Sequence, residues 1–432
     1  MTPSAAPGAW PLVGHAPALL RDPLGFLASL PAHGDLVAVR IGPFRAVVVC
    51  DPALTRQVLA DDRTYDKGGP IVDRAAEAIG RGLGTCPHSE HRRQRRLTQP
   101  AFHPSRMAGY ARVMAAGTAA VTAAWRHGEV LDVLAQTHRI AHDVVVEALF
   151  TGALPPEDRG RVVEDVTTVL THAYRRAVLP PLAALPTPAN RRYHRARARL
   201  RRTLHAVVTE RRAHGTDHGD LLSALDTTRS GLTVEETVDQ AVAIIAAGTD
   251  TTAVALAWAL HLLARRPAVQ HRVAAEATTV LGGATPDLGH VPGLALTGRV
   301  LDEALRLYPP GWLFTRTVTT PTALGGCPLP AGTTVVYSPY VLHHRPDLHP
   351  QPGTFDPDRT LRKDAFLPFA TGPRTCIGAR FATVTATLAL AHITRSWHLE
   401  PVPGTHVRPA TGLVLRPSGL RLRVLARGTG GT

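Results

Sequence analysis

A nearly continuous apolar run at residues 238–264 constrains the fold more than any other feature of this chain. Thr233 and Glu236 match a capping box ahead of the run, and Arg265-Arg266-Pro267 stops it. The pattern predicts a helix of about 30 residues, roughly 45 Å long, which would cross a whole globule. Because a helix that is apolar on all sides must be buried on all sides, we expect it at the centre of a large fold.

Polar residues interrupt this run at its midpoint, where Gly248 is followed by Thr249, Asp250, Thr251 and Thr252. They argue against a membrane span, and burying them without partners would cost free energy. Two interpretations stay open. The group is either a water-filled kink in a core helix, or a site where the missing side chain of Gly248 lets a ligand approach the backbone.

Composition and charge exclude several classes of protein. With 432 residues, 44% of them hydrophobic, the chain can bury a sizeable core, so it is neither disordered nor a small disulfide scaffold. The four cysteines form no C-x-x-C pair, and the amino terminus resembles neither a signal peptide nor a membrane anchor, which indicates a cytoplasmic protein. All but two of the 48 basic residues are arginines, a skew that a GC-rich genome explains better than nucleic-acid binding does. The basic run 191–202 is typical of a solvated helix face, and an acidic protein partner would suit the net charge of +14.

The order of segments predicts a mainly α-helical protein with small β-sheets near both ends. Residues 36–50 predict a strand pair, residues 52–309 are mostly helical, and short extended pieces follow between 333 and 424. The extended pieces are 36–41, 46–50, 333–338, 413–415 and 420–424. Since no repeat, linker or abrupt change of composition divides the chain, we expect one large domain over residues 1–432.

Cys376 lies just before a segment with helical periodicity, 379–396, in a loop that contains Gly372, Pro373 and Gly378. Free N–H groups and the helix dipole stabilise a thiolate at such a place, which predicts a lowered pKa for Cys376. The thiolate would be a nucleophile or a soft metal ligand, and an inert buried cysteine is the third possibility. No cysteine-hydrolase signature surrounds it and no other ligands cluster with it, which favours haem held by one axial cysteine.

The pattern Phe369-x-x-Gly372-x-Arg374-x-Cys376-x-Gly378 resembles the haem-binding loop of the cytochrome P450 family. The polar group in the long helix is similar to the acid–alcohol pair of that family. The resemblance implies a single large fold that encloses haem b between the central long helix and the cysteine loop. It also implies that Cys376 supplies the axial thiolate to the iron.

Other segments resemble the same family in the expected order. Glu303 and Arg306 are similar to its E-x-x-R helix, and Arg359 would complete a structural salt-bridge network with them. The residues that match the contacts of the family to the haem propionates are His91, Arg95, Arg316 and Arg374. We assign Asp61-Asp62 to helix-end solvation.

The resemblance implies a monooxygenase that hydroxylates or further oxidises a lipophilic small molecule with O2 and two electrons. Asp250 and Thr251 would deliver protons, and family members that use peroxide often lack this pair. A haem-binding sensor would not need the pair, and that different class of protein stays open.

The electrons must come from a separate protein, because the chain has no flavin or iron–sulfur segment. The resemblance implies a ferredoxin and a ferredoxin reductase, and we expect the protein itself to be a monomer. An acidic ferredoxin would suit a basic surface around the cysteine loop. Arg92, Arg93 and Arg96 either serve that docking or form a solvated helix face.

The substrate pocket is expected between the central helix, the loop after Pro310 and residues 68–84. The candidate lining residues are mostly apolar: Ala243, Ala246, Ala247, Trp312, Leu313 and Phe314. Segments 66–70 and 86–88 resemble actinobacterial family members that tailor sesquiterpenes, which favours a sesquiterpene or another secondary metabolite. Tailoring of a polyketide, a fatty acid or a macrolide stays open.

Overall fold

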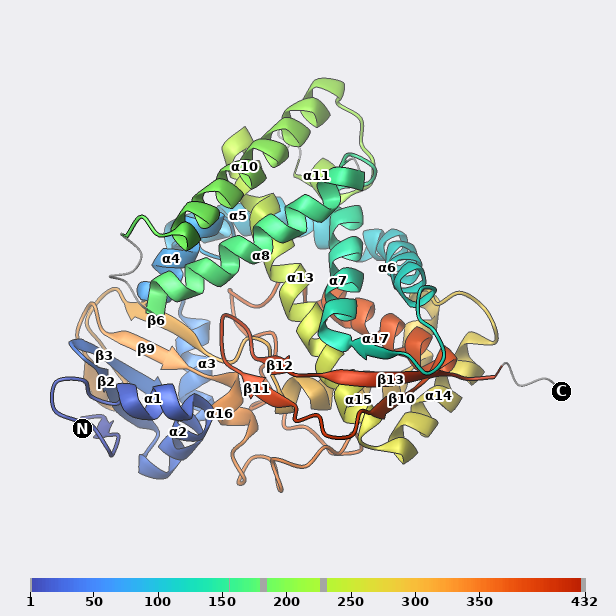
Figure 1. Ribbon diagram of the computed structural model, residues 1–432. Helices are drawn as coiled ribbons and strands as arrows, with labels where there is room; N and C mark the ends of the chain where they lie inside the picture. Colours follow the sequence, from blue (N-terminus) through green and yellow to red (C-terminus); the bar gives the residue numbers. More distant parts are fainter. Residues whose placement is uncertain (1, 155, 179–184, 226–230, 429–432) are drawn as a thin grey trace.

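The computed structural model describes residues 2–154, 156–178, 185–225 and 231–428 (Figure 1). Helices dominate and the sheets are small, which confirms the expected fold class. The described helices are α1 (Ala16–Arg21), α2 (Pro23–Ser29), η1 (Leu30–His33), α3 (Pro52–Ala60), α4 (Pro70–Ile79), α5 (His88–Thr98), η2 (Gln99–Phe102), η3 (Pro104–Arg106), α6 (Met107–Thr122), α7 (Val133–Phe150), α8 (Pro156–Val178), α10 (Pro188–His214), α11 (Leu221–Ala224), α13 (Val234–Ala264), α14 (Pro267–Leu281), η4 (Leu288–Gly293), α15 (Ala295–Leu307), α16 (Pro339–His343) and α17 (Ala379–Ser396). The described strands are β1 (Ser4–Ala5), β2 (Leu36–Ile41), β3 (Phe44–Val49), β4 (Tyr65–Asp66), β5 (Val130–Asp132), β6 (Phe314–Val318), β7 (Thr322–Leu324), β8 (Cys327–Leu329), β9 (Thr334–Tyr337), β10 (Trp397–Pro401), β11 (Arg408–Ala410), β12 (Arg416–Ser418) and β13 (Arg421–Ala426).

The long helix α13 runs through the middle of the molecule, as predicted (Figure 1). The Thr233 hydroxyl accepts a hydrogen bond from the Glu236 N–H, and the Glu236 carboxylate accepts one from the Thr233 N–H, which confirms the capping box. α7, α10 and α17 all pack against α13. Within the described part of the chain it is the one helix long and apolar enough to cross a membrane, but 72% of its most apolar window is buried inside the protein.

The largest sheet joins the two extended regions that the sequence predicts near the ends of the chain. Its strand order is β1-β2-β3-β9-β6-β4. β2 and β3 form the predicted antiparallel pair, with Leu36 opposite Val49, and β9 lies parallel to β3. A second sheet of order β10-β13-β5 brings the end of the chain against the segment just before α7.

The predicted strand at residues 413–415 is wrong, because the strand in this region is β12, which pairs with β11. Leu415 is instead fully buried in a core cluster. Its carbonyl accepts a hydrogen bond of 2.9 Å from the indole N–H of Trp258 on α13. The apolar residues here fix a loop to the central helix. A buried loop segment of this kind has the same apolar composition as a short strand, so the sequence pattern cannot distinguish the two.

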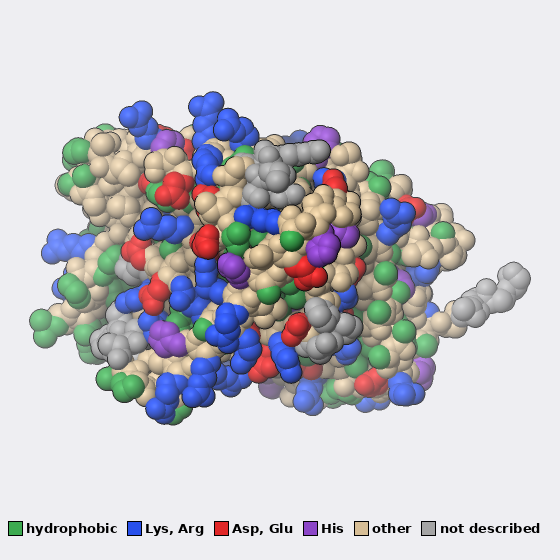
Figure 2. Space-filling model, turned by 90° about the horizontal axis from the view of Figure 1, so that it is seen from above, with side chains coloured by type: hydrophobic (Ala, Val, Ile, Leu, Met, Phe, Trp, Pro, Cys, Tyr) green, Lys and Arg blue, Asp and Glu red, His purple; other side chains and the backbone are tan. Residues whose placement is uncertain are grey.

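The basic run 191–202 lies on α10, which crosses the top of the molecule in Figure 1. Seen from above, this face carries many Lys and Arg side chains (Figure 2). The exposed arginines of the run are Arg191, Arg192, Arg195, Arg199 and Arg202. Two of them pair with acidic residues of α8, Arg192 with Glu164 and Arg199 with Asp165. The prediction of a solvated helix face is therefore confirmed.

Candidate functional site

The cysteine loop ends where α17 begins, with Gly378 at the N-cap position. The Cys376 N–H donates to the Phe369 carbonyl at 2.9 Å, which closes the loop. Gly372 has φ +73°, and a Cβ there would lie 2.2 Å from the Leu59 carbonyl oxygen. Only glycine fits this position, so the loop lies directly against the end of α3.

The expectation of a lowered pKa for Cys376 is wrong for this chain by itself. Burial raises the pKa of the thiol, while the Gly378 N–H and the Arg95 guanidinium act in the opposite direction without overcoming it. The side chain nevertheless keeps exposed surface. Protein thus surrounds much of the thiol, and the exposed surface of Cys376 leaves a ligand access to the residue.

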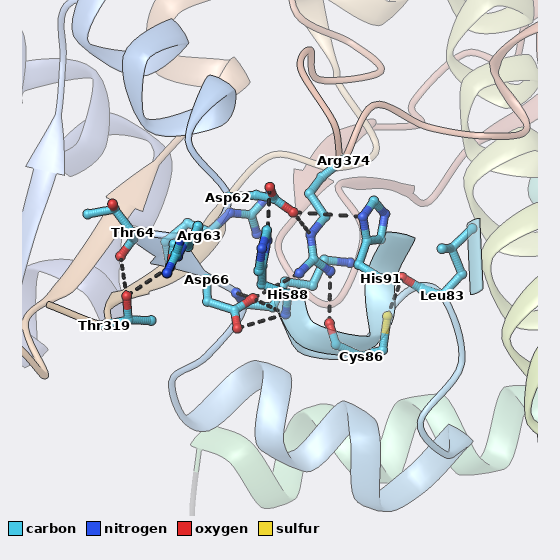
Figure 3. A network of polar contacts seen from close by, with 12 residues as sticks. Asp62, Arg63, Thr64, Asp66, Leu83, Cys86, His88, His91, Thr319 and Arg374 are labelled. Atoms are coloured by element: carbon cyan, nitrogen blue, oxygen red, sulfur yellow. Dashed lines mark hydrogen bonds and ion pairs between the residues drawn. The ribbon is translucent and has the colours of Figure 1, made fainter. Parts of the chain in front are cut away.

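Arg374 of the cysteine loop binds the segment 62–86, which follows α3 in the chain (Figure 3). Its guanidinium donates at 2.8 Å to the Asp62 carboxylate, to the Asp66 carboxylate and to the Cys86 carbonyl. The Arg374 side chain is only 1% exposed. Helix-end solvation is therefore wrong for Asp62, which is a buried partner of Arg374, although it holds for Asp61, the exposed C-cap residue of α3.

α5 brings His91 and Arg95 to the same place. His91 is buried, with Nδ1 3.7 Å from the Asp62 carboxylate. Burial and the nearby Arg374 lower the pKa of His91 to about 4, so its ring is neutral at physiological pH. Arg95 donates a short hydrogen bond to the carbonyl of Thr375, the residue before the cysteine. The helical i, i+4 spacing thus carries both residues to the cysteine loop.

Arg316 and Lys67 show that this interior suits an anionic group. Arg316 is 4% exposed and lies over the Tyr337 ring, and within the described residues its guanidinium has only the Thr315 carbonyl as a hydrogen-bond acceptor. The Lys67 ammonium donates to the Gly84 carbonyl, and burial together with Arg316 and Arg374 lowers the pKa of Lys67 to about 7. Arg316 is buried and Lys67 is half-buried, and neither has a carboxylate partner among the described residues. Such cations are costly, and two propionates would neutralise them. The donor set therefore fits haem.

Sequence reasoning missed Lys67 as part of this cluster. The available signal was its rarity, since only one other lysine occurs among the 48 basic residues. An ammonium is a compact point charge and can enter a space that a guanidinium cannot.

The polar group of α13 divides between two faces of the helix. Ala247 is exposed and Thr251 is half-buried, and the Thr251 hydroxyl donates to the Ala247 carbonyl at 2.6 Å. Asp250 points elsewhere and accepts a hydrogen bond of 2.8 Å from Nε2 of His138 on α7. Sequence reasoning missed His138, which lies 112 residues from its partner.

The space left by Gly248 is filled by a neighbouring helix and not by a ligand. A Cβ at this position would lie 3.1 Å from a methyl group of Val145 on α7. The missing side chain therefore lets α7 lie close to α13. Thr249 and Thr252 are buried beside it, and Thr249 Oγ1 has no hydrogen-bond partner in the described part of the chain.

The structure brings Glu303, Arg306 and Arg359 together as the sequence predicts. Both carboxylate oxygens of Glu303 accept from Arg306, at 2.7 and 2.8 Å, and one also accepts from Arg359 at 3.3 Å. The other N–H groups of Arg306 donate to three backbone carbonyls, those of His343, Pro352 and Thr354. All five N–H groups of a fully buried guanidinium are thus satisfied.

The candidate pocket residues are only partly brought together. Gly82 packs on Ala243, since a Cβ at Gly82 would lie 3.1 Å from the Ala243 Cβ, so the segment 68–84 does meet the central helix. Ala246 is buried in a core cluster, and Ala247 is the exposed member of the three.

Trp312 packs into a core cluster. Its ring is buried in the cluster that contains Leu24 and Leu27 of α2, and its indole N–H donates to the Gly412 carbonyl at 3.0 Å. A buried indole needs such an acceptor, and this loop supplies it. Leu313 packs against the same cluster, while Phe314 is 38% exposed and stacks on the Tyr337 ring.

Together, the cysteine loop ahead of α17, the buried cations beside it and the polar middle of α13 define a haem-thiolate protein. The family model described as cytochrome P450 matches residues 3–424, and the chain belongs to the cytochrome P450 family. Members use haem b with a cysteine thiolate as axial ligand and act as monooxygenases that need a lipophilic substrate, O2 and a redox partner.

Three curated relatives from Streptomyces are similar over nearly the whole chain. Cyclooctatin synthase of Streptomyces melanosporofaciens is 44% identical, over 97% of this chain and 95% of its own length. Pentalenene oxygenase of Streptomyces avermitilis is 43% identical, over 98% of both chains. Cyclooctat-9-en-7-ol 5-monooxygenase of Streptomyces melanosporofaciens is 43% identical, over 94% of this chain and 91% of its own. The likeness to actinobacterial terpene-tailoring members is thus confirmed, and an enzyme is favoured over a haem sensor.

Proposed function

We propose that the protein is a monooxygenase that inserts oxygen into a C–H bond of a terpene, with haem b held by the Cys376 thiolate. When bound, haem would activate O2 with the two electrons that the redox partner delivers. Cys376 is open on one side to take the iron, and a thiol that coordinates a metal is deprotonated outright. Arg95, Arg316 and Lys67 are the cations that would hold the propionates. Arg374, which already pairs with Asp62 and Asp66, would add its positive charge beside them.

Asp250 and Thr251 deliver protons in this proposal. The Thr251 hydroxyl lies beside the exposed Ala247 on α13, where it can hold an ordered water. Asp250 is 29% exposed and can exchange protons with solvent. Thr251 thus positions a proton beside the reacting atoms, and Asp250 supplies the next proton from solvent.

The substrate is a terpene hydrocarbon or terpene alcohol of the kind named for the relatives, pentalenene and cyclooctat-9-en-7-ol. The observations that carry this are the names of these relatives and the exposed, apolar Ala247 beside Thr251 on α13. Titration of the oxidised haem protein with terpenes, a fatty acid and a macrolide tests the choice. We expect a high-spin shift of the Soret band with a terpene only. A shift with the fatty acid or the macrolide alone would contradict the terpene assignment and leave the monooxygenase class intact.

The redox partner is an acidic ferredoxin that docks beside the cysteine loop. A depression of about 870 Å³ lies between α5 and this loop. His91 and Arg95 of the haem-binding cluster line it, and Arg92, Arg96 and Pro373 line it as well. Arg93 is excluded from the docking group, because it forms an ion pair of 2.6 Å with Glu236 at the start of α13. The expected docking group therefore reduces to Arg92 and Arg96. In this proposal the protein works as a cytoplasmic monomer.

Reversing the charge of both Arg92 and Arg96 to Glu tests the docking. We expect ferredoxin-driven turnover to fall by about tenfold at low ionic strength, with a smaller loss at high salt, because charged rims mainly set the association rate. Peroxide-driven product formation and haem content should not change. Arg195→Glu, on the exposed face of α10, is the matched control. Equal loss of both activities would indicate damage to the haem site and would count against docking at this surface.

A further inference from the structure

A histidine–carboxylate pair links α7 to the middle of α13. His138 Nε2 lies 2.8 Å from Oδ1 of Asp250, and the two side chains are 32% and 29% exposed. The other ring nitrogen, Nδ1, lies 2.9 Å from the carbonyl oxygen of Leu134, one turn back on α7. The ring is therefore fixed at both ends, by its own helix and by the carboxylate of the central one.

The two contacts of the ring determine how many protons the pair holds. A carbonyl oxygen can only accept, so Nδ1 must carry a hydrogen and donate it to Leu134. Nε2 faces a carboxyl group, which leaves two arrangements: imidazolium with carboxylate, or neutral imidazole with carboxylic acid. Both arrangements keep both hydrogen bonds. His138 and Asp250 together thus hold one proton that can move between them without loss of either contact.

The close packing of the two helices explains why the pair stays aligned. Val145 of α7 sits against the bare backbone of Gly248, two residues before Asp250. A larger residue at Gly248 would push α7 away from α13. The glycine that the sequence analysis singled out therefore sets the helix spacing beside the His138–Asp250 contact.

We propose that His138 is a positioning residue that holds the proton used by Asp250, an inference that rests on the proposed monooxygenase function. The proton on Nε2 moves to Oδ1, which breaks the N–H bond and forms the carboxylic acid and a neutral imidazole. Asp250 and Thr251 lie on different faces of α13 and both are half-buried, so in this proposal Asp250 gives the proton up through solvent water to the site at Thr251 and becomes a carboxylate again. The partly exposed imidazole regains a proton from solvent, which returns the pair to its starting state.

Two substitutions separate the holding of a proton from simple support of the carboxylate. His138→Gln can still donate a hydrogen bond to Asp250 but cannot carry a transferable proton, and His138→Ala loses both functions. We expect both variants to lower the ratio of product to NADH consumed by about tenfold and to raise the solvent deuterium isotope effect on turnover. This loss is smaller than the roughly 100- to 10,000-fold contribution of a general acid itself, because Asp250 remains. The dissociation constant for the terpene and the melting temperature of the haem protein, both measured apart from activity, should stay near those of the wild type.

A double-mutant cycle gives the decisive comparison. In the Asp250→Asn background, His138→Gln should cause no further loss, because both residues act through one proton. Equal coupling in wild type and both His138 variants would overturn the proposal, as would full rescue by glutamine with loss only in alanine, since that means support without proton holding. Additive losses in the cycle would also overturn it. If the wild type itself formed no product with any terpene, the proposed function would fail instead, and that result is distinct from each of these.

Discussion

Glu303→Ala is expected to lose about 3–5 kcal/mol of folding free energy, which is the cost of leaving a buried charge without its partner. Arg306 is fully buried and its five N–H groups are all bonded, two of them to Glu303. The loss is a large share of the stability of an ordinary domain, about 5–15 kcal/mol. We therefore expect most of the variant to be found in inclusion bodies and the soluble part to melt far below the wild type.

Asp358→Ala is the matched control, because it removes a carboxylate that also binds two arginines. Asp358 pairs with Arg272 at 2.8 Å and with Arg299 at 3.1 Å, but its side chain is 50% exposed. The two guanidinium groups lower the pKa of Asp358 to about 2, yet solvent screening limits such a surface pair to about 1 kcal/mol or less. Equal destabilisation of the two variants in urea or thermal unfolding would contradict the structural role given to Glu303.

Thr251→Ala is expected to uncouple electron use from product formation. NADH and O2 consumption should continue, while product per NADH falls by about tenfold or more and hydrogen peroxide accumulates, because the hydroxyl that positions the proton is gone. Thr251→Ser keeps the hydroxyl and should restore most of the coupling. Thr252→Ala changes the same residue type on the buried side of the helix and should leave coupling unchanged. Unchanged coupling in Thr251→Ala would show that this hydroxyl has no part in oxygen activation.

Local sequence patterns predicted the elements whose causes are local. The capping box at Thr233 and Glu236 marks the start of α13, and the glycine spacing of the cysteine loop specifies a turn ahead of α17. The E-x-x-R spacing likewise places Glu303 and Arg306 on one helix face. In each case the residues that interact lie within a few positions of one another, so spacing alone carries the geometry.

Residues whose partners are distant could not be interpreted in this way. Asp62 meets Arg374 across 312 residues of chain, and Asp250 meets His138 across 112. The sequence leaves open what approaches the backbone at Gly248, and the structure shows that it is Val145 of the neighbouring helix. A polar residue or a glycine has the same appearance in a sequence whether it faces a ligand or another helix, and only tertiary packing decides.

The difference spectrum of the dithionite-reduced protein with and without carbon monoxide tests the central claim, that Cys376 provides the thiolate ligand of haem b. We expect the Soret band typical of thiolate-ligated haem in the wild type and its absence in Cys376→Ser loaded with haem. The same band in Cys376→Ser, or no such band in haem-loaded wild type, would contradict the assignment.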